Sequence, residues 1–210
     1  MSEKHQVHNL IILDESGSMS SIKQPIISGF NELVQTIKGI EKEFAEQEHF
    51  ISLVTFNGLG KKILHFIDPA GKLNEIDDAR YQPNADTPLF DAMGFAFNKL
   101  MKFLEGKNDY NVLVTILTDG EENSSKEYNE QAIKSLIEEL KNKNWTFTYI
   151  GTDHDVEKFA VSVSITNTMM FEKNNDSMHN MFMKEQSARH RYSANIREKK
   201  ETKDDFYKEE

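Results

Sequence analysis

The chain of 210 residues contains no cysteine. This absence excludes disulfide bonds, thiolate metal ligands and a cysteine nucleophile. Positive charge is also scarce, because 25 lysine and arginine residues stand against 35 aspartate and glutamate residues, which gives a formal net charge of -10 at pH 7. A surface that binds nucleic acid carries a basic stripe. The charge balance therefore argues against nucleic acid as a partner.

Long hydrophobic runs are absent from the sequence as well. No apolar run approaches the roughly 20 residues that a helix needs to span a bilayer, so we expect no membrane association. The first residues, Met1 to His8, are mostly polar and show no signal peptide. We therefore expect a cytoplasmic, soluble protein. Its length suits one domain with its own hydrophobic core.

Short apolar runs between turn residues predict buried strands. They cover residues 7–13, 50–56, 62–67, 111–117, 145–150 and 168–171. The run 111–117 is the most apolar and is expected near the centre of the sheet. Asn57-Gly58 favours a tight hairpin, so the third strand should run antiparallel to the second.

Apolar residues in steps of three and four predict helices between these strands. The expected helices cover about 26–44, 88–104, 126–143, 155–163 and the segment from Ser177 onward. Alternation of strands and helices predicts an α/β fold: a three-layer, Rossmann-like open sheet, mostly parallel with one antiparallel edge strand, and helices on both faces. We expect the main domain to cover residues 1–175. Residues 176–210 should form a C-terminal helix that packs on the domain and a charged tail that is disordered.

Oxygen-bearing side chains follow two of the strongest predicted strands. Asp14, Ser16 and Ser18 come directly after the first strand, and Asp119 follows the strand 111–117. Thr87 stands just before a predicted helix. In open α/β sheets ligands bind beyond the carboxyl ends of the strands. Carboxylates and hydroxyls are hard donors that suit Mg²⁺, with Mn²⁺ or Ca²⁺ as alternatives.

Three segments resemble the metal-ion-dependent adhesion site of von Willebrand factor A domains. They are residues 14–19 (Asp-Glu-Ser-Gly-Ser-Met), 87–92 (Thr-Pro-Leu-Phe-Asp-Ala) and 117–123 (Leu-Thr-Asp-Gly-Glu-Glu-Asn). The short first segment is most similar to that of the intracellular bacterial members. The resemblance implies that Ser16, Ser18 and Thr87 contact the metal directly, whereas Asp14 and Asp119 act mainly through water. One departure is the sequence Asn-Ala-Asp at 84–86, where the family often has glycine.

A divalent ion held largely by neutral hydroxyls keeps much of its charge, so it favours an anionic oxygen as a further ligand. We therefore expect a protein-binding module, not an enzyme, that docks a carboxylate of a partner protein onto the ion. The three segments contain no histidine or lysine to act as a base, and we assign no catalytic residue. Glu15, Glu121 and Asp91 are expected at a ligand-binding, acidic rim, although for Asp91 the favoured interpretation is a first-turn helix residue that the helix dipole stabilises.

Two alternatives stay open at this point. One is a metal-assisted phosphoester hydrolase that uses the same cation. The other is a structural interaction protein without a metal, in which the same residues serve as turn and cap residues. Asp153-His154-Asp155 has the residue types of a second metal site, but capping of the following helix is the favoured interpretation.

Overall fold

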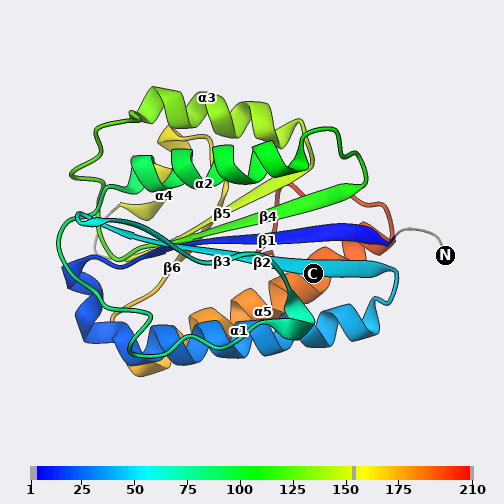
Figure 1. The fold of residues 1–210 in the computed structure, drawn as a ribbon, viewed down its shortest axis with the longest axis horizontal. Coiled ribbons are helices and arrows are strands. Elements are labelled where there is room, and N and C mark those ends of the chain that lie inside the picture. Colours follow the sequence, from blue (N-terminus) through cyan, green and yellow to red (C-terminus); the bar gives the residue numbers. More distant parts are fainter. Residues whose placement is uncertain (1–3, 153–154, 209–210) are drawn as a thin grey trace.

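The structure, a computed structural model, describes residues 4–152 and 155–208 (Figure 1). Its strands form one six-stranded sheet in the order β3-β2-β1-β4-β5-β6. The strands are β1 (His5–Asp14), β2 (Gln47–Asn57), β3 (Gly60–Pro69), β4 (Tyr110–Leu117), β5 (Trp145–Gly151) and β6 (Asn167–Met170). All neighbouring pairs are parallel except β2 and β3. The prediction of a mostly parallel sheet with one antiparallel edge strand is confirmed.

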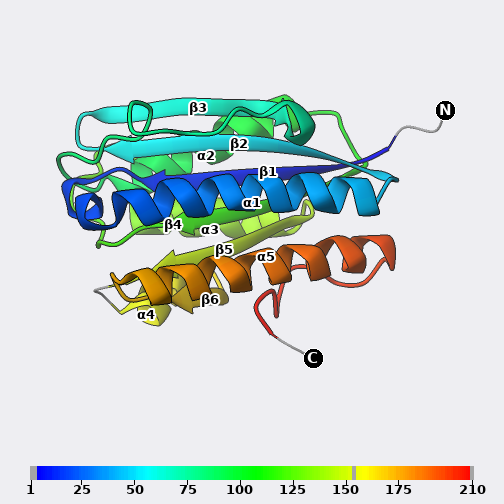
Figure 2. The same cartoon turned by 90° about the horizontal axis from the view of Figure 1, so that it is seen from below.

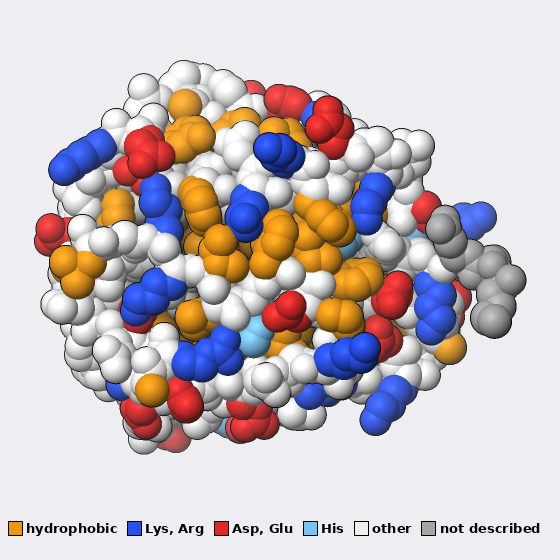
Figure 3. All heavy atoms as spheres, viewed as in Figure 1, with side chains coloured by type: hydrophobic (Ala, Val, Ile, Leu, Met, Phe, Trp, Pro, Cys, Tyr) orange, Lys and Arg blue, Asp and Glu red, His pale blue; other side chains and the backbone are white. Residues whose placement is uncertain are grey.

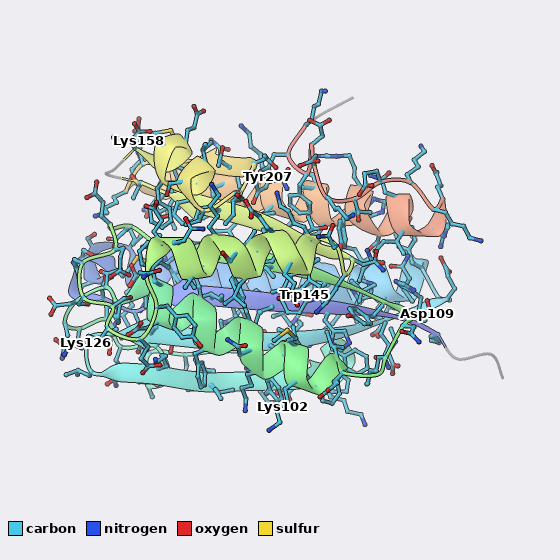
Figure 4. The ribbon with its side chains drawn as sticks, turned by 90° about the horizontal axis from the view of Figure 1, so that it is seen from above. Lys102, Asp109, Lys126, Trp145, Lys158 and Tyr207 are labelled. Carbon is cyan, nitrogen blue, oxygen red and sulfur yellow. The ribbon has the colours of Figure 1, made fainter. Side chains whose placement is uncertain are left out.

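Helices cover both faces of this sheet (Figures 1 and 2). The helices are α1 (Lys23–Glu43), α2 (Leu89–Leu104), α3 (Glu130–Lys141), α4 (Val156–Ser162) and α5 (Asn175–Arg197), with short 3-10 turns η1 (Gly17–Ile22) and η2 (Ala70–Lys72). On one face α2 and α3 lie side by side (Figure 4), and on the other α1 and α5 do so (Figure 2). No helix in residues 4–152 and 155–208 is long and apolar enough to cross a membrane.

The first strand shows how the sequence builds two hydrophobic cores from one apolar run. Successive side chains of a strand point to opposite faces of the sheet. Leu10 and Ile12 accordingly pack in the core beneath α2 and α3, whereas Ile11 and Leu13 pack in the core beneath α1 and α5. Because both faces are covered, the segment from Leu10 to Leu13 is apolar without a break and does not alternate with polar residues.

The turn between β2 and β3 is the two-residue hairpin that the sequence predicts. Asn57 pairs with Gly60 across the turn, and the Asn57 Oδ1 atom accepts a hydrogen bond from the amide of Leu59 at 3.0 Å. Gly60 has a φ of +147°, a conformation that glycine adopts without the clash a Cβ atom would cause. The antiparallel edge therefore follows from local turn chemistry.

The direction in which strands are added to the sheet reverses between β1 and β4. After β1 the chain continues to β2 on one side, and β4 is added later on the other side. Residues Leu13 and Leu117 are neighbours in the register of β1 and β4, so the loops after these strands meet. In Figure 4, Lys126 and Lys158 lie at this carboxyl end, and Asp109 lies at the opposite end.

Hydrophobic side chains also gather on the surface formed by β3 and α2, among several lysines (Figure 3). The ammonium of Lys99 lies 4.5 Å from the ring centre of Phe66, and that of Lys107 lies 4.1 Å from the ring centre of Phe103. Lysine stems and cation–π contacts therefore cover part of this apolar surface.

The expectation of a disordered tail is wrong for the residues that the structure describes after α5. The chain turns back beyond Arg197, and Phe206 is buried against Val7 and Tyr192. The side chain of Asn167 in β6 accepts a hydrogen bond from the amide of Phe206 at 3.0 Å. Phe206, Tyr207 and the side chain of Asn167 thus hold this charged segment against the domain.

Candidate functional site

Asp14 ends β1 and shapes the loop that follows it. Its Oδ1 atom accepts a hydrogen bond from the amide of Ser16 at 2.7 Å, and its Oδ2 atom accepts one from the hydroxyl of Thr118 at 2.6 Å. The hydroxyl of Tyr81 donates to the carbonyl oxygen of Asp14 at 2.7 Å. The carboxylate is therefore fully buried and connects the ends of β1 and β4.

The two serines join Asp14 to Asp119. The hydroxyl oxygens of Ser16 and Ser18 are 3.1 Å apart, and the Ser18 hydroxyl donates to the Oδ1 atom of Asp119 at 2.6 Å. Ser16 and Asp119 are buried, whereas Ser18 is exposed. The group of oxygen atoms is therefore closed toward the sheet and accessible to solvent at Ser18.

Thr87 reaches this group from the loop before α2. Its amide donates to the Oδ1 atom of Asn123 at 3.0 Å, and the amide of Asn123 donates back to the Thr87 carbonyl at 3.2 Å. A Cβ atom placed on Gly120 would lie 3.6 Å from the Thr87 hydroxyl oxygen, so this hydroxyl faces the turn after β4. Asp14, Ser16, Ser18, Thr87 and Asp119, which we call the carboxyl-end cluster, are therefore brought to one end of the sheet.

The loop before Thr87 turns without the glycine that the family often has. Ala85 has a φ of 62°, in the left-handed region that a residue with a side chain occupies at a cost of about 1 kcal/mol. Its carbonyl oxygen accepts a hydrogen bond from the amide of Gly17 at 2.9 Å. The loop that carries Thr87 is thus fixed to the loop that carries the two serines.

Buried negative charge is the main electrostatic feature of the carboxyl-end cluster. Burial raises the pKa of Asp14 to about 6, and the nearby charge of Asp119 adds to this effect, while hydrogen bonds from Thr118 and Ser16 oppose it. The Nζ atom of Lys173 lies 2.9 Å from the Oδ2 atom of Asp119. The ammonium of Lys173 is thus paired with Asp119, while Asp14 accepts hydrogen bonds from neutral groups, and this excess of negative charge favours a further cation.

The donor atoms fit a hard divalent cation. Two carboxylates and three hydroxyls supply oxygen atoms alone, the donor type that Mg²⁺ and Ca²⁺ prefer. In the part of the chain that the structure describes, no three histidine, aspartate or glutamate side chains converge in a metal-binding group. A metal here would therefore depend on the serine and threonine hydroxyls as well as on the two carboxylates.

Glu15 does not lie on the exposed acidic rim where the sequence led us to expect it. Its side chain is buried, and its Oε1 atom lies 2.7 Å from the Nζ atom of Lys62 and accepts a hydrogen bond from the amide of Gln82. The rim prediction is wrong for this residue because the loop at 82–84 folds over it. Glu121 is exposed next to the carboxyl-end cluster, in agreement with a rim position.

Asp91 is also mostly buried, and its carboxylate is occupied by backbone amides. It accepts hydrogen bonds from the amides of Lys126, Glu127 and Tyr128 at 2.9, 2.8 and 2.9 Å. Burial opposes ionisation of Asp91, but the three amides outweigh it and lower its pKa. Its position in the first turn of α2 matches the helix-dipole role that aspartate favours. The sequence favours this first-turn role for Asp91, and its position in α2 agrees with it.

Several contacts of the site could not be predicted from the sequence. Lys62 and Lys173 supply the positive charges, yet both stand far along the chain from the three motif segments. Thr118 lies within the motif, but nothing in the pattern assigned it to Asp14. The capping interpretation is confirmed for Asp155, whose side chain accepts a hydrogen bond from the amide of Lys158 at 3.0 Å. The residues at 153–154 lie outside the described residues.

Comparisons with known proteins agree with this fold. The sequence model of the von Willebrand factor type A domain family matches residues 10–189. No curated protein sequence matches the chain significantly. The VWA domain of SpRpn10 has a TM-score of 0.55 and 8% identity, over 85% of this chain and 94% of that domain.

Two larger proteins contain a similar structure. Proximal thread matrix protein 1 from the mussel byssus has a TM-score of 0.51 and 13% identity, over 86% of this chain and 45% of that one. The pilus adhesin SpaC from Lactobacillus rhamnosus GG, in its open conformation, has a TM-score of 0.59 and 11% identity, over 89% of this chain and 30% of that one. The chain thus spans less than half of either protein, and at these identities the likeness concerns the fold alone.

Proposed function

The chain belongs to the von Willebrand factor type A domain family, and on that premise we propose that it is a metal-dependent protein-binding module. Domains of this family are generally protein-interaction modules. In this proposal Ser16, Ser18 and Thr87 contact a divalent cation directly, and Asp14 and Asp119 hold it mainly through water. Mg²⁺ is the preferred ion, with Mn²⁺ and Ca²⁺ as alternatives of the same oxygen preference.

The observation that carries the proposal is the hydrogen bond from the Ser18 hydroxyl to Asp119. This contact joins donors from the ends of two different strands at one point that solvent can reach. The buried carboxylates of Asp14 and Asp119 supply the negative charge that attracts a cation, and a single ammonium group does not balance them. Hydroxyls and carboxylates in such a position match the needs of a hard ion.

The proposed partner is another protein that presents an acidic side chain. A divalent ion with neutral hydroxyl ligands retains charge that an external carboxylate can balance. The nearby carboxylates do not compete for this role, because Glu15 pairs with Lys62 and Asp91 accepts backbone amides. The exposed Glu121 would influence which partners approach.

Isothermal titration with MgCl₂ tests the metal requirement. We expect one ion per chain for the native sequence and an affinity at least about tenfold lower for Ser16→Ala, the loss that even an indirect partner of a metal ligand typically causes. The matched control is Ser28→Ala, the same change at an exposed position of α1, which should bind as the native chain does. Equal affinity in all three proteins would place the ion elsewhere.

Thermal unfolding gives an independent reading of the same site. A ligand at one hundred times its dissociation constant stabilises the folded state by about 2.7 kcal/mol. The melting temperature of the native chain should therefore rise with Mg²⁺ and return with EDTA. A melting temperature that is indifferent to both additions in the native chain contradicts the proposal.

One observation favours a second candidate, a metal-independent interaction module. The ammonium of Lys173 already provides a cation for Asp119 in the absence of a metal. The two candidates differ in a pull-down from cell extract with the immobilised native chain. A metal-dependent module loses its partner with EDTA and in Ser16→Ala, whereas a metal-independent module keeps its partner under both conditions.

A further inference from the structure

Lys173 reaches the carboxyl-end cluster from the loop between β6 and α5, outside the three motif segments. Its Nζ atom lies 2.9 Å from the Oδ2 atom of Asp119, and the Asp119 side chain is 0% exposed, against 24% for that of Lys173. The other oxygen of Asp119 accepts the hydrogen bond from Ser18. Both oxygens of this buried carboxylate are thus engaged, one of them by a cation that belongs to the chain itself.

The backbone on either side of Lys173 is held in place. The amide of Phe171 donates to the carbonyl of Gly151 in β5 at 3.1 Å, and the amide of Glu172 donates to the hydroxyl of Ser177 in α5 at 2.8 Å. Asn174 caps α5 by accepting from the Ser177 amide at 2.8 Å. Because this backbone is anchored, displacement of the Lys173 ammonium from Asp119 would be a rotation of the side chain and would not require movement of α5.

We propose that the ammonium of Lys173 is an internal cation that competes with a divalent ion for Asp119 and thereby sets the metal affinity of the site. This inference rests on the proposed function, since it takes the carboxyl-end cluster to bind a metal. A divalent ion compensates the charge of two buried carboxylates more fully than one ammonium group does. An ammonium and a divalent ion held together in a poorly solvated site would repel each other strongly, so one displaces the other.

Titration with MgCl₂ alone tests this competition in the full chain. The variant Lys173→Met keeps most of the aliphatic stem and removes the ammonium. We expect it to bind Mg²⁺ about tenfold more tightly or better, because a hydrogen bond to a charged partner contributes about the free energy that corresponds to one decade in affinity. Lys173→Arg keeps the positive charge and should remain close to the native chain.

The matched control is Lys158→Met, which removes the same charge at the same end of the molecule (Figure 4). Lys158 is exposed, so screening by salt leaves it little influence on a buried ion and a small change in affinity is expected. An equal gain in both methionine variants would show that general charge, and not occupation of Asp119, sets the affinity, and would overturn the inference.

Amine labelling followed by peptide mass spectrometry provides a reading that does not depend on affinity. In the metal-free native chain, reductive methylation of Lys173 should be slow relative to the exposed Lys199, because the ammonium is paired with a buried carboxylate. Saturating Mg²⁺ should raise the rate at Lys173 and leave Lys199 unchanged. A rate at Lys173 that does not respond to bound Mg²⁺ contradicts displacement.

The outcomes separate the two proposals. If the native chain and Lys173→Met bind Mg²⁺ equally well and both lose it in Ser16→Ala, the competition is refuted and the metal-dependent function stands. If no variant binds Mg²⁺, the proposed function fails and the competition fails with it. Tighter binding confined to Lys173→Met supports both.

Discussion

Two groups of buried charged side chains lie on the same sheet, the carboxyl-end cluster beyond the strands and another beneath α5. The second group, which we call the α5 cluster, consists of Asn9, Thr115, Glu185, Arg189 and Tyr207. The Nη2 atom of Arg189 lies 2.8 Å from the Oε1 atom of Glu185, with side chains 2% and 1% exposed. Arg189 also donates to Asn9 at 2.7 Å, and the hydroxyl of Tyr207 donates to the other oxygen of Glu185 at 2.7 Å.

The two clusters differ in charge balance and in access to solvent. In the α5 cluster one guanidinium faces one carboxylate, and both are enclosed by neutral hydrogen-bond partners. In the carboxyl-end cluster the ammonium of Lys173 pairs with Asp119, Asp14 has neutral hydrogen-bond partners, and Ser18 is exposed. Burial of charge is therefore common to both places. The carboxyl-end cluster has an excess of negative charge and is open to solvent at Ser18. These two properties distinguish it, as a candidate binding site, from the balanced and enclosed α5 cluster.

The largest effect is expected from breaking the α5 cluster. Arg189→Met leaves Glu185 buried without its counter-charge, so the free energy of unfolding should fall by roughly 3–5 kcal/mol. Urea unfolding measures this loss. The control is Arg191→Met, on the same helix but partly exposed, which should change stability by less than about 1 kcal/mol. Similar losses in both variants would mean that the cluster has no special structural role.

Acid should weaken the fold through two buried histidines, His49 beside Asn9 of the α5 cluster and His8 against Phe103 of α2 on the other face of the sheet. Burial, with help from nearby positive charge, lowers the pKa of His8 to about 4 and that of His49 to about 3. Because an unfolded histidine takes up a proton near pH 6.5, stability is full above that pH and declines as the pH falls toward these values. At pH 5 the loss is about 2 kcal/mol for each residue.

Urea unfolding between pH 7 and pH 5 measures this dependence. His49→Gln should flatten the profile, whereas His190→Gln, at a largely exposed position, should leave its slope nearly unchanged. Identical pH profiles for His49→Gln and the native chain would show that His49 takes up its proton as readily in the folded state as in the unfolded one, and would contradict the prediction.

Much of the fold follows from the sequence, and so does the meeting of the motif segments. The run 7–13 is recognisable as a buried strand and the run 111–117 as a central one, and the carboxyl ends of neighbouring parallel strands meet at one edge. Asp14 and Asp119 therefore had to be close. The charge pairs could not be predicted, because Lys173 and Lys62 reach their partners through tertiary folding and stand in stretches without a pattern.

The sequence also provides no indication that Glu15 and Phe206, which lie outside helices and strands, are buried. Glu15 is in a polar turn, where solvation is the usual state, and its burial depends on the distant loop that covers it. Phe206 is one aromatic residue in a charged tail, and its packing against Val7 is a long-range contact. Local composition describes neither of these contacts.

A smaller effect is expected from the hydrophobic seam between α1 and α5. A Cβ atom on Gly29 would lie 2.0 Å from the ring of Phe182, so Gly29→Ala should cost about 1–3 kcal/mol through overpacking. Gly39 lies in the same helix with no atom within 4 Å of such a Cβ, and Gly39→Ala should stabilise by about 0.5–1 kcal/mol. Thermal unfolding of the two variants gives the comparison, and a shift of the same sign in both would contradict it.

The central claim is that the carboxyl-end cluster binds a cation and the α5 cluster does not. Locating a bound ion tests this claim most directly. Mn²⁺ broadens the nuclear magnetic resonance signals of amides near it, so a titration with substoichiometric Mn²⁺ reports where the ion resides. We expect selective broadening at Ser16, Ser18 and Gly120, and sharp signals around Glu185 and Arg189. Broadening spread over the acidic surface, or centred away from the ends of β1 and β4, would contradict the carboxyl-end cluster as a cation site.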